Sequence, residues 1–532
     1  MTRSRVKQAL GRMPATAEAY QALLADGGQP EGGYRLDRLE AALPGWVEAG
    51  VEARFGKPQL PDRKVLLVGY LPWWLEYASA LATLFASLGC KVGLGYLPYR
   101  RWTEMVQAFD RRRQSAYLRG VLASAKELFE VHDISVPARQ QLDKELVSEL
   151  EALSRSDVQY TLQREDVEDS LAGELFRLRL ERNLVAAKSI LSLLDGEDYE
   201  VVVIPNGSIL EFGATYLAAR YRGATVVTYE FGEQRERIWL AQNAEVMRQD
   251  TTVLWEARGR AELTNSERSE LESMFAARRS GRQWAQFARQ WQSVPSRGAR
   301  KVAELLDLDL SRPIALLCTN VVGDSLALNR QLFTSGMAEW LTVTAKHFES
   351  LDTGQLVVRV HPGEMLGAGH PSTEIVRTAL PDLPPHVKLV GPDSEINTYD
   401  LIELANLGLV YTSTVGLEMA MAGIPVIVAG DTHYRGKGFT TDPRSVEDYL
   451  AEVDRALASD EAKLGEDRRE LAVRYAYRFF YEYPFPSPWH LIGFWDDVEA
   501  RPVEEVIGSP EAYLDTMRAL VGEPIDWTMK HG

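Results

Sequence analysis

Short, unbroken apolar runs alternate with segments of helical periodicity along most of this 532-residue chain. The first such unit comprises an apolar run at 64–69, a helical pattern over 73–88 and a second apolar run at 91–97. Apolar runs without polar alternation are typical of strands buried on both faces. Two buried strands joined by a helix lie parallel in one sheet, so the pattern predicts a doubly wound α/β fold.

The alternation occurs in two series. The first resumes with strand-like runs at 200–205 and 224–229, after a Leu-, Arg- and Glu-rich helical stretch. The second series contains apolar runs at 313–319, 355–360, 387–390, 407–411 and 425–429. We therefore expect two tandem Rossmann-like domains, the first with a helical insertion and the second followed by a helical tail.

The expected domain boundaries follow from shifts in composition. We place a first domain at 1–255, with its helical insertion at about 100–195, and a polar helical linker at 256–310. The second domain is expected at 311–460, and an aromatic-rich helical tail at 461–532 is expected to pack back on the first domain. Ligands of open α/β sheets bind beyond the carboxyl ends of the strands, so the loops that follow the strands are the candidate site.

Charge excludes one broad class of function. Asp and Glu outnumber Lys and Arg by 76 to 59, giving a formal net charge of −17. A nucleic-acid-binding chain normally has the opposite balance or a strong basic stripe, so no nucleic-acid partner is expected. The one dense basic run, 111–113, is typical of a solvated helix face, and it also suits an anionic acceptor or membrane surface.

The sequence predicts a cytoplasmic protein. Residues 1–15 are polar and basic and lack the apolar core of a signal peptide. The longest apolar runs have the length of strands rather than of membrane spans. Cys90 and Cys318 lie in apolar surroundings, as expected of buried thiols in a reducing compartment. Any membrane contact is therefore expected to be peripheral, at the inner face of the membrane.

The segment 411–425 carries the clearest candidate for a phosphate site. A strand is followed by Ser413 and Thr414, and Thr414 is the expected N-cap of the next helix. The free N–H groups of a helix start, with hydroxyls nearby, suit a phosphate or diphosphate. Gly416 would allow a ligand to approach the first turn, and Glu418 could accept hydrogen bonds from ribose hydroxyls. The alternative interpretation of Glu418 is an acidic residue that is favoured at this position by the helix dipole alone.

A second candidate follows the strand at 356–360. Arg359 lies within this strand, and His361 follows it where the sheet crevice is expected. Pro362 restricts His361 to extended geometry. A histidine at this position could donate to a phosphate or act as an acid toward a leaving phosphate, and a hydrogen-bonded loop histidine is the alternative.

Polar loops after other strands provide further candidates. Asn320 follows the first strand of the second domain, and a basic, glycine-rich loop at 430–439 follows the last. In the first domain, Glu230 ends a strand and could activate an acceptor hydroxyl as a general base. The alternative interpretation is that these segments are ordinary surface loops, which have the same composition. The remaining candidates for phosphate or sugar contacts are Lys437, Trp73, Asn206, His433 and Tyr434. No Cys/His spacing typical of zinc occurs, so we expect no metal and no bound cofactor.

These motifs, in this order, resemble the capsular polysaccharide biosynthesis proteins, a family that includes the bacterial Kdo transferases of capsule export. The resemblance covers about 311–488 and is weak before residue 200. It implies a GT-B fold with the donor nucleotide on the second domain. The residues that carry it are His361-Pro-Gly-Glu364, Asn397-Thr-Tyr-Asp-Leu-Ile402, Thr412-Ser-Thr-Val-Gly-Leu-Glu418, Ala422-Gly-Ile-Pro-Val-Ile427, Gly438-Phe-Thr440 and the aromatic run 475–484.

The resemblance implies roles for several residues. His361-Pro362 and Ser413-Thr414 would bind the nucleotide and phosphate of the donor, and Glu230-Phe-Gly232 loosely matches a motif that supplies the base. The expected activity is a metal-independent glycosyl transfer from a nucleotide-activated sugar, CMP-Kdo-like in preference to UDP- or GDP-linked. The acceptor would be a surface polysaccharide or glycolipid. A sugar-nucleotide 2-epimerase of the same fold and a non-catalytic scaffold of a polysaccharide assembly complex are the alternatives.

Overall fold

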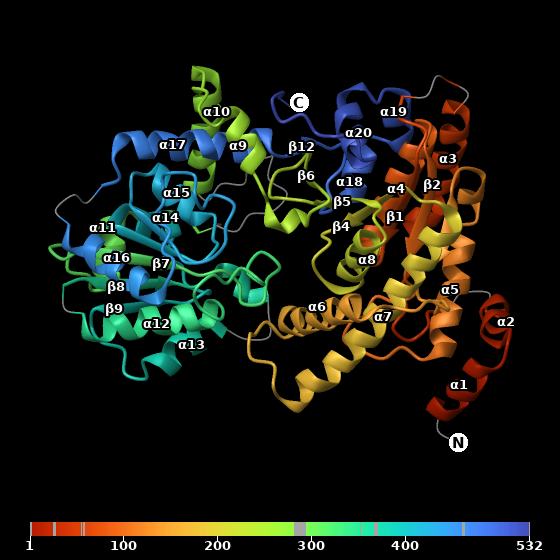
Figure 1. The fold of residues 1–532 in the computed structure, drawn as a ribbon, viewed down its shortest axis with the longest axis horizontal. Helices are drawn as coiled ribbons and strands as arrows, with labels where there is room; N and C mark the ends of the chain where they lie inside the picture. The colour runs from red at the N-terminus through yellow and green to blue at the C-terminus, as the bar shows by residue number, and fades with distance from the viewer. Residues whose placement is uncertain are drawn as a thin grey trace.

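Two sheets organise the chain in the computed structural model (Figure 1), which describes residues 3–24, 28–54, 56, 59–280, 294–351, 353–366, 371–459 and 463–530. The first sheet has seven strands in the order β12-β6-β5-β4-β1-β2-β3, and β1 to β5 run parallel. Its strands are β1 (Lys64–Gly69), β2 (Lys91–Tyr96), β3 (Glu130–Asp133), β4 (Val201–Pro205), β5 (Thr225–Glu230), β6 (Arg237–Gln242) and β12 (Phe485–Pro486).

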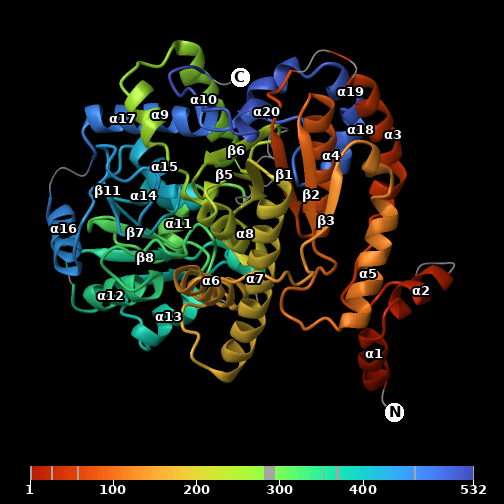
Figure 2. The ribbon, with the colours of Figure 1, turned by 45° about the vertical axis from the view of Figure 1, so that its right-hand side comes forward.

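The second sheet is entirely parallel, with five strands in the order β11-β10-β7-β8-β9. These strands are β7 (Ile314–Cys318), β8 (Gln355–Arg359), β9 (Val387–Val390), β10 (Leu407–Val410) and β11 (Val426–Val428). Helices lie on both faces of each sheet (Figures 1 and 2). The predicted α/β class, with two tandem Rossmann-like domains, is therefore confirmed.

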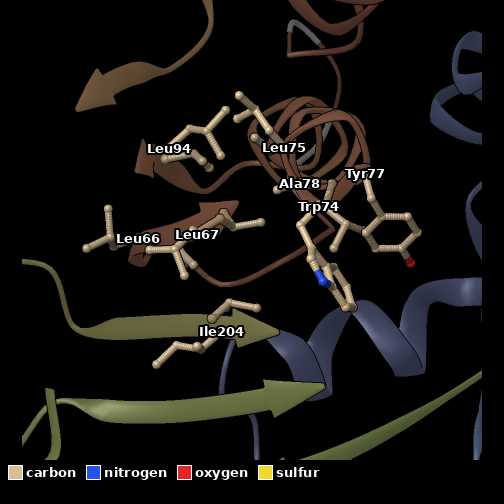
Figure 3. Close-up of a cluster of buried hydrophobic side chains, with 14 of the residues drawn as sticks. Leu66, Leu67, Trp74, Leu75, Tyr77, Ala78, Leu94 and Ile204 are labelled. Atoms are coloured by element: carbon tan, nitrogen blue, oxygen red, sulfur yellow. The ribbon is translucent and has the colours of Figure 1, made fainter. Parts of the chain in front are cut away.

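The central strands form where the sequence places apolar residues on both faces of the sheet. Leu66, Leu67 and Ile204 are all at most 1% exposed, because α4 (Pro72–Ser87) and α8 (Leu210–Tyr221) cover the sheet. Figure 3 shows this core, with Trp74 of α4 beside the arrowheads of the strands that carry Leu67 and Ile204. Burial on both faces gives these strands continuous apolar runs, the pattern by which the sequence identifies them.

The remaining helices connect or cover the sheets. Those of the first domain are α1 (Arg3–Arg12), α2 (Thr16–Leu23), α3 (Asp37–Ala53), α5 (Ala108–Val121), α6 (Lys144–Leu162) and α7 (Ser170–Glu197). Along the chain, the segment that connects the two sheets contains α9 (Thr252–Arg258), α10 (Asn265–Arg279) and α11 (Ala299–Leu305). The second sheet carries α12 (Met337–Ser350), α13 (Pro371–Ala379), α14 (Thr398–Leu404), α15 (Val415–Met421) and α16 (Val446–Ala458). None of the described helices is both long and apolar enough to cross a membrane.

The stretch predicted as a purely helical insertion contains a strand. β3 pairs parallel with β2 and forms an edge of the first sheet. Its sequence, Glu-Val-His-Asp, lacks an apolar run because an edge strand stays partly solvated. The insertion also reaches the second domain: the carboxylate of Glu165, beyond α6, accepts hydrogen bonds from the backbone N–H groups of Met337 and Ala338, both at 2.8 Å. It therefore bridges the two domains at the start of α12.

The tail connects the two sheets. α17 (Glu466–Tyr477) packs against α15 of the second domain, after which β12 pairs antiparallel with β6 of the first sheet. The chain then continues through α18 (Phe494–Ala500), α19 (Val503–Gly508) and α20 (Leu514–Leu520), which lie on the first domain (Figures 1 and 2). The aromatic segment between α17 and β12 is buried.

Candidate functional site

Three predicted segments meet at the carboxyl edge of the second sheet, because β10, β7 and β8 are neighbours in it. The Asn320 side-chain oxygen, after β7, accepts a hydrogen bond from the backbone N–H of Thr412, after β10, at 3.1 Å. The Thr319 hydroxyl accepts one from the backbone N–H of His361, after β8, at 3.0 Å. These bonds fix the two candidate phosphate segments on either side of the β7 loop.

The imidazole of His361 is held in one orientation. Its Nδ1 accepts the backbone N–H of Gly363 at 2.9 Å, in the turn Pro362–Leu366 that Pro362 begins. With Nδ1 acting as acceptor, the proton of the neutral ring lies on Nε2. Burial and the nearby Arg359 guanidinium lower the pKa of His361 to about 4. Both effects favour the uncharged ring, which donates through Nε2–H, and donation to a phosphate is one of the two roles expected from the sequence.

Arg359 brings a buried positive charge to the same edge. Only 3% of this residue is exposed, and burial lowers the pKa of its guanidinium. Its Nη1 donates to the carbonyl of Gly391 at 2.5 Å, and its Nε lies 3.5 Å from the Thr398 hydroxyl. Neither of these hydrogen-bond partners carries a charge, and Asp393 is an acidic residue near enough to raise the pKa of the guanidinium against the effect of burial.

The Ser413–Thr414 turn differs in detail from the prediction. Thr414 is the N-cap residue of α15, as predicted, but it has helical backbone angles and its side chain makes no capping bond. The Ser413 hydroxyl lies 3.4 Å from the backbone N–H of Val415. Tyr434, predicted to contact sugar or acceptor, is fully buried and donates to the Ser413 carbonyl at 2.6 Å. Tyr434 thus supports this turn from within the core, and Gly416 is required because a Cβ there would overlap the Tyr434 hydroxyl.

Glu418 is already engaged by an arginine that sequence analysis did not single out. Its carboxylate pairs with Arg278 of α10 at 2.8 Å, and its side chain is 6% exposed. Arg278 also pairs with Glu233, which follows β5 of the first domain. In the sequence, Arg278 lies in a charged linker helix and carries no signal of this contact.

Two residues of the 430–439 loop have partners within the protein. The ring of His433 stacks on Phe479, with ring centroids 3.9 Å apart, and its Nδ1 lies 2.9 Å from the Tyr475 hydroxyl. Burial and nearby cations lower the pKa of His433 to about 3, which favours the neutral ring. Lys437 donates to the Thr252 hydroxyl at 3.2 Å, which ties it to the start of α9.

In the first domain, Asn206 and Glu230 are brought together because β4 and β5 are neighbours. The Asn206 amide donates to the Glu230 carboxylate at 3.2 Å, while the other Glu230 oxygen accepts the N–H of Phe231 at 3.0 Å. The amide thus orients the carboxylate, as a general base requires. Trp73 begins α4 beyond β1 and is 43% exposed, whereas Trp74 is buried.

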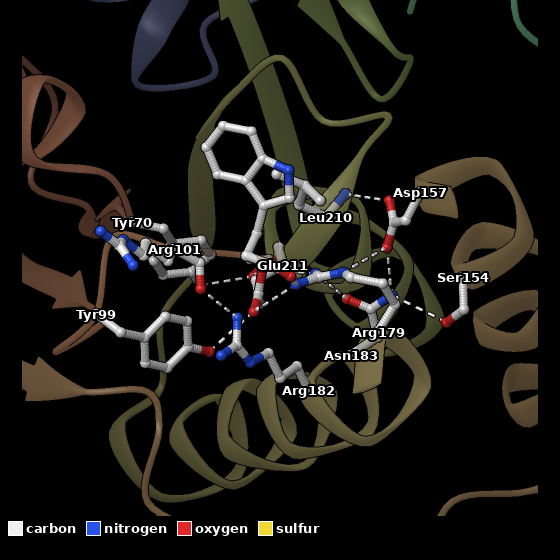
Figure 4. A network of polar contacts seen from close by, with 12 residues as sticks. Tyr70, Tyr99, Arg101, Ser154, Asp157, Arg179, Arg182, Asn183, Leu210 and Glu211 are labelled. Atoms are coloured by element: carbon white, nitrogen blue, oxygen red, sulfur yellow. Dashed lines mark hydrogen bonds and ion pairs between the residues drawn. The ribbon is translucent and has the colours of Figure 1, made fainter. Parts of the chain in front are cut away.

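A buried ionic network lies beside the start of α8 (Figure 4). Arg179 of α7, fully buried, pairs with Asp157 at 3.3 Å and with Glu211 at 2.7 Å. Asn183 donates to Asp157 at 2.7 Å, and the Tyr99 hydroxyl donates to Glu211 at 2.8 Å. Burial raises the pKa of Asp157, whereas Arg179 outweighs burial at Glu211 and lowers its pKa. The network fixes the helical insertion to the carboxyl edge of the first sheet.

The two largely parallel sheets, with helices on both faces, define the chain as a two-domain α/β protein with tandem Rossmann-like domains. The model of one family, described as capsule polysaccharide biosynthesis protein, matches residues 280–475. This match confirms, over that region, the resemblance predicted from the motifs of the second domain. No curated protein matches the chain. Among the described residues, no group of three or more His, Cys, Asp or Glu side chains is placed to hold a metal ion.

Solved structures with a similar fold have low identity to this chain. Two are KpsC enzymes of Thermosulfurimonas dismutans. The beta Kdo 2,4 transferase has 18% identity and a TM-score of 0.34, and the match covers 55% of this chain and 83% of that one. The beta Kdo 2,7 transferase has 15% identity and a TM-score of 0.33, and the match covers 56% of this chain and 82% of that one. The UDP-GlcNAc 2-epimerase of Neisseria meningitidis has 11% identity and a TM-score of 0.29, covering 78% and 97%. These likenesses assign no residue roles to this chain.

Proposed function

We propose that this protein is a glycosyltransferase that takes a sugar from a nucleotide-activated donor, with a CMP-Kdo-like donor favoured. The observation that carries the proposal is the convergence of Arg359, the Nε2–H donor of His361 and the Ser413–Thr414 turn at one edge of the second sheet. Positive charge and fixed donors at a sheet edge suit a nucleotide phosphate. The family match over the same region supports this assignment.

In the proposed reaction, an acceptor hydroxyl attacks the anomeric carbon of the donor sugar. The new carbon–oxygen bond forms as the bond from the anomeric carbon to the phosphate oxygen breaks. Glu230, oriented by Asn206, accepts the proton of the hydroxyl. The negative charge that develops on the departing phosphate is stabilised by the Nε2–H of His361 and by the Arg359 guanidinium. Pro362 holds His361 in place.

Several finer points belong to the same proposal. The acceptor is a surface polysaccharide or glycolipid, and Trp73 and Asn206 lie near the bound acceptor. The protein is cytoplasmic and reaches this acceptor at the inner face of the membrane. Asn320 and Lys437 contribute to the donor side.

We also propose that the reaction needs no metal, because Arg359 and His361 supply the positive charge and the donor group. Turnover measured with and without EDTA tests this point directly.

Replacing Ser413 and Thr414 together with alanine is expected to weaken nucleotide binding without unfolding the second domain. The hydroxyls would be lost from the proposed phosphate site, while Thr414 makes no capping bond whose loss would destabilise α15. The measurement is the shift in melting temperature on adding CMP, CDP, UDP or GDP. A ligand at 100 times its dissociation constant stabilises the native state by about 2.7 kcal/mol.

The matched control for this double variant is Ser445→Ala. Ser445 is the N-cap of α16 and accepts the Asp448 N–H, so its loss should cost about 1 kcal/mol of stability. It should leave the nucleotide-induced shift unchanged. An unaltered shift in the folded Ser413/Thr414 double variant would remove these hydroxyls from the donor site.

A further inference from the structure

One guanidinium connects the two proposed halves of the active site. Arg278 lies near the end of α10 and pairs with Glu418 of α15 at 2.8 Å and with Glu233 beyond β5. Its side chain is 12% exposed, and the rings of Phe275 and Phe480 lie 5.5 and 5.0 Å away. Burial alone would lower the pKa of Arg278, yet the two carboxylates raise it above its ordinary value. The group is therefore a fixed cation between the domains.

The helix that carries Arg278 packs with the second domain. Leu271, Met274 and Phe275 of α10 belong to the same buried cluster as Leu417 and Val428. Glu418 therefore sits on the same body as Arg278, while Glu233 belongs to the loop after β5 of the first sheet. The Arg278–Glu233 pair is thus a contact between domains.

The position of Glu233 determines where the proposed base lies. Glu233 follows Glu230 by three residues, and the intervening loop is tightly packed. The Gly232 carbonyl lies 3.2 Å from Nε2 of His490, and a Cβ on Gly232 would lie 2.7 Å from the Trp239 ring. A loop this short and this closely packed transmits a displacement of Glu233 to Glu230.

We propose that Arg278 is a positioning residue, which through Glu233 holds the base-bearing loop of the first domain in register with the nucleotide site of the second. This inference rests on the proposed function and deepens it. Glu418, the proposed ribose contact, shares the same guanidinium, so occupancy of the nucleotide site and the placement of Glu230 are coupled. Catalysis is sensitive to such placement, because a misplacement of about 1 Å can cost about 100-fold in rate.

The decisive variant is Glu233→Gln, which weakens the contact between domains but leaves the Arg278–Glu418 pair intact. Glu233 is 30% exposed, so the variant is expected to fold. We expect kcat for nucleotide release to fall by about 10- to 100-fold, while the dissociation constant of the product nucleotide stays within about twofold. Arg278→Gln should both lower kcat and weaken nucleotide binding, because it also leaves the buried Glu418 carboxylate without its cation.

The matched control is Arg268→Gln on the same helix. Arg268 pairs with Glu470 of α17, which packs on α15 of the second domain, and its loss should change neither kcat nor nucleotide affinity. A second readout is hydrogen exchange of the 230–233 segment, which nucleotide should protect in the wild-type protein and not in Arg278→Gln. Wild-type kcat in Glu233→Gln, or equal protection in both proteins, would overturn the inference. Absence of turnover with every sugar nucleotide in the wild-type protein would instead refute the proposed function.

Discussion

Replacing His361 with alanine is expected to lower kcat by about 10²–10³-fold, the effect typical of removing one donor aimed at a developing negative charge. The reason is the fixed orientation of the ring: Gly363 occupies Nδ1, so Nε2–H is directed by the turn rather than by the ligand. Because the pKa of His361 is about 4, the ring should keep this role throughout the neutral range. The measurement is the pH profile of kcat for nucleotide release, in which no ionisation of His361 near its ordinary pKa of about 6.5 is expected.

The variant His361→Asn distinguishes the structural role of His361 in the turn from its proposed role in catalysis. Its side-chain oxygen can accept the Gly363 N–H as Nδ1 does, but its amide group does not extend to the place of Nε2. His361→Asn should therefore melt closer to wild type than His361→Ala and remain slow. The control is His347→Ala, near the carboxyl end of α12, where the imidazole pairs with Asp454. If His361→Ala released nucleotide at the wild-type rate, the histidine would be structural and the leaving-group role would have to be reassigned.

Replacing Arg179 with methionine is expected to reduce the free energy of unfolding by about 3–5 kcal/mol, because it leaves two buried carboxylates without their cation. Asp157 and Glu211 are both nearly inaccessible, and each would have to take up a proton or admit water. Urea unfolding, followed by circular dichroism, measures the change. The insertion should loosen first, because Arg179 connects α7 to both α6 and α8.

Arg222→Met provides the comparison for Arg179→Met. Arg222 follows α8 and pairs with Asp195 of α7, so it also joins α7 to α8, but the side chains of this pair are 47% and 29% exposed. Exposed pairs contribute about 0–1 kcal/mol, so the two variants should differ severalfold in their effect on stability. Equal effects would show that burial of the network is not what stabilises this part of the protein.

The strands with continuous apolar runs could be predicted from the sequence in both sheets, whereas β3, β6 and β12 of the first sheet could not. The apolar runs of β1, β7 and β8 are buried on both faces and differ from prediction only at their ends. β3 and β6 contain polar residues that are only partly buried, and β12 has only two residues, Phe485 and Pro486. Such strands form because a neighbouring strand is available, a fact that local sequence does not contain.

The same distinction applies to the site. Asn320, His361 and the Ser413 turn could be grouped in advance, because parallel strands end at one edge. His433 looked like a loop residue, but an aromatic segment more than 40 positions later in the chain buries it. Arg179 and Arg278 lie on helices whose charges resemble solvated faces. Their partners come from other elements, so only the tertiary structure reveals them.

Nucleotide release from a panel of CMP-, UDP- and GDP-linked sugars, with and without glycan acceptors, is the most direct test of the central claim. The proposal predicts release of one nucleotide class, faster with acceptor present and abolished or strongly reduced in His361→Ala. A 2-epimerase would convert the sugar while keeping its nucleotide attached, and a scaffold would turn over nothing. Conversion of the donor without nucleotide release, or no turnover of any donor by the folded protein, would contradict the assignment as a glycosyltransferase.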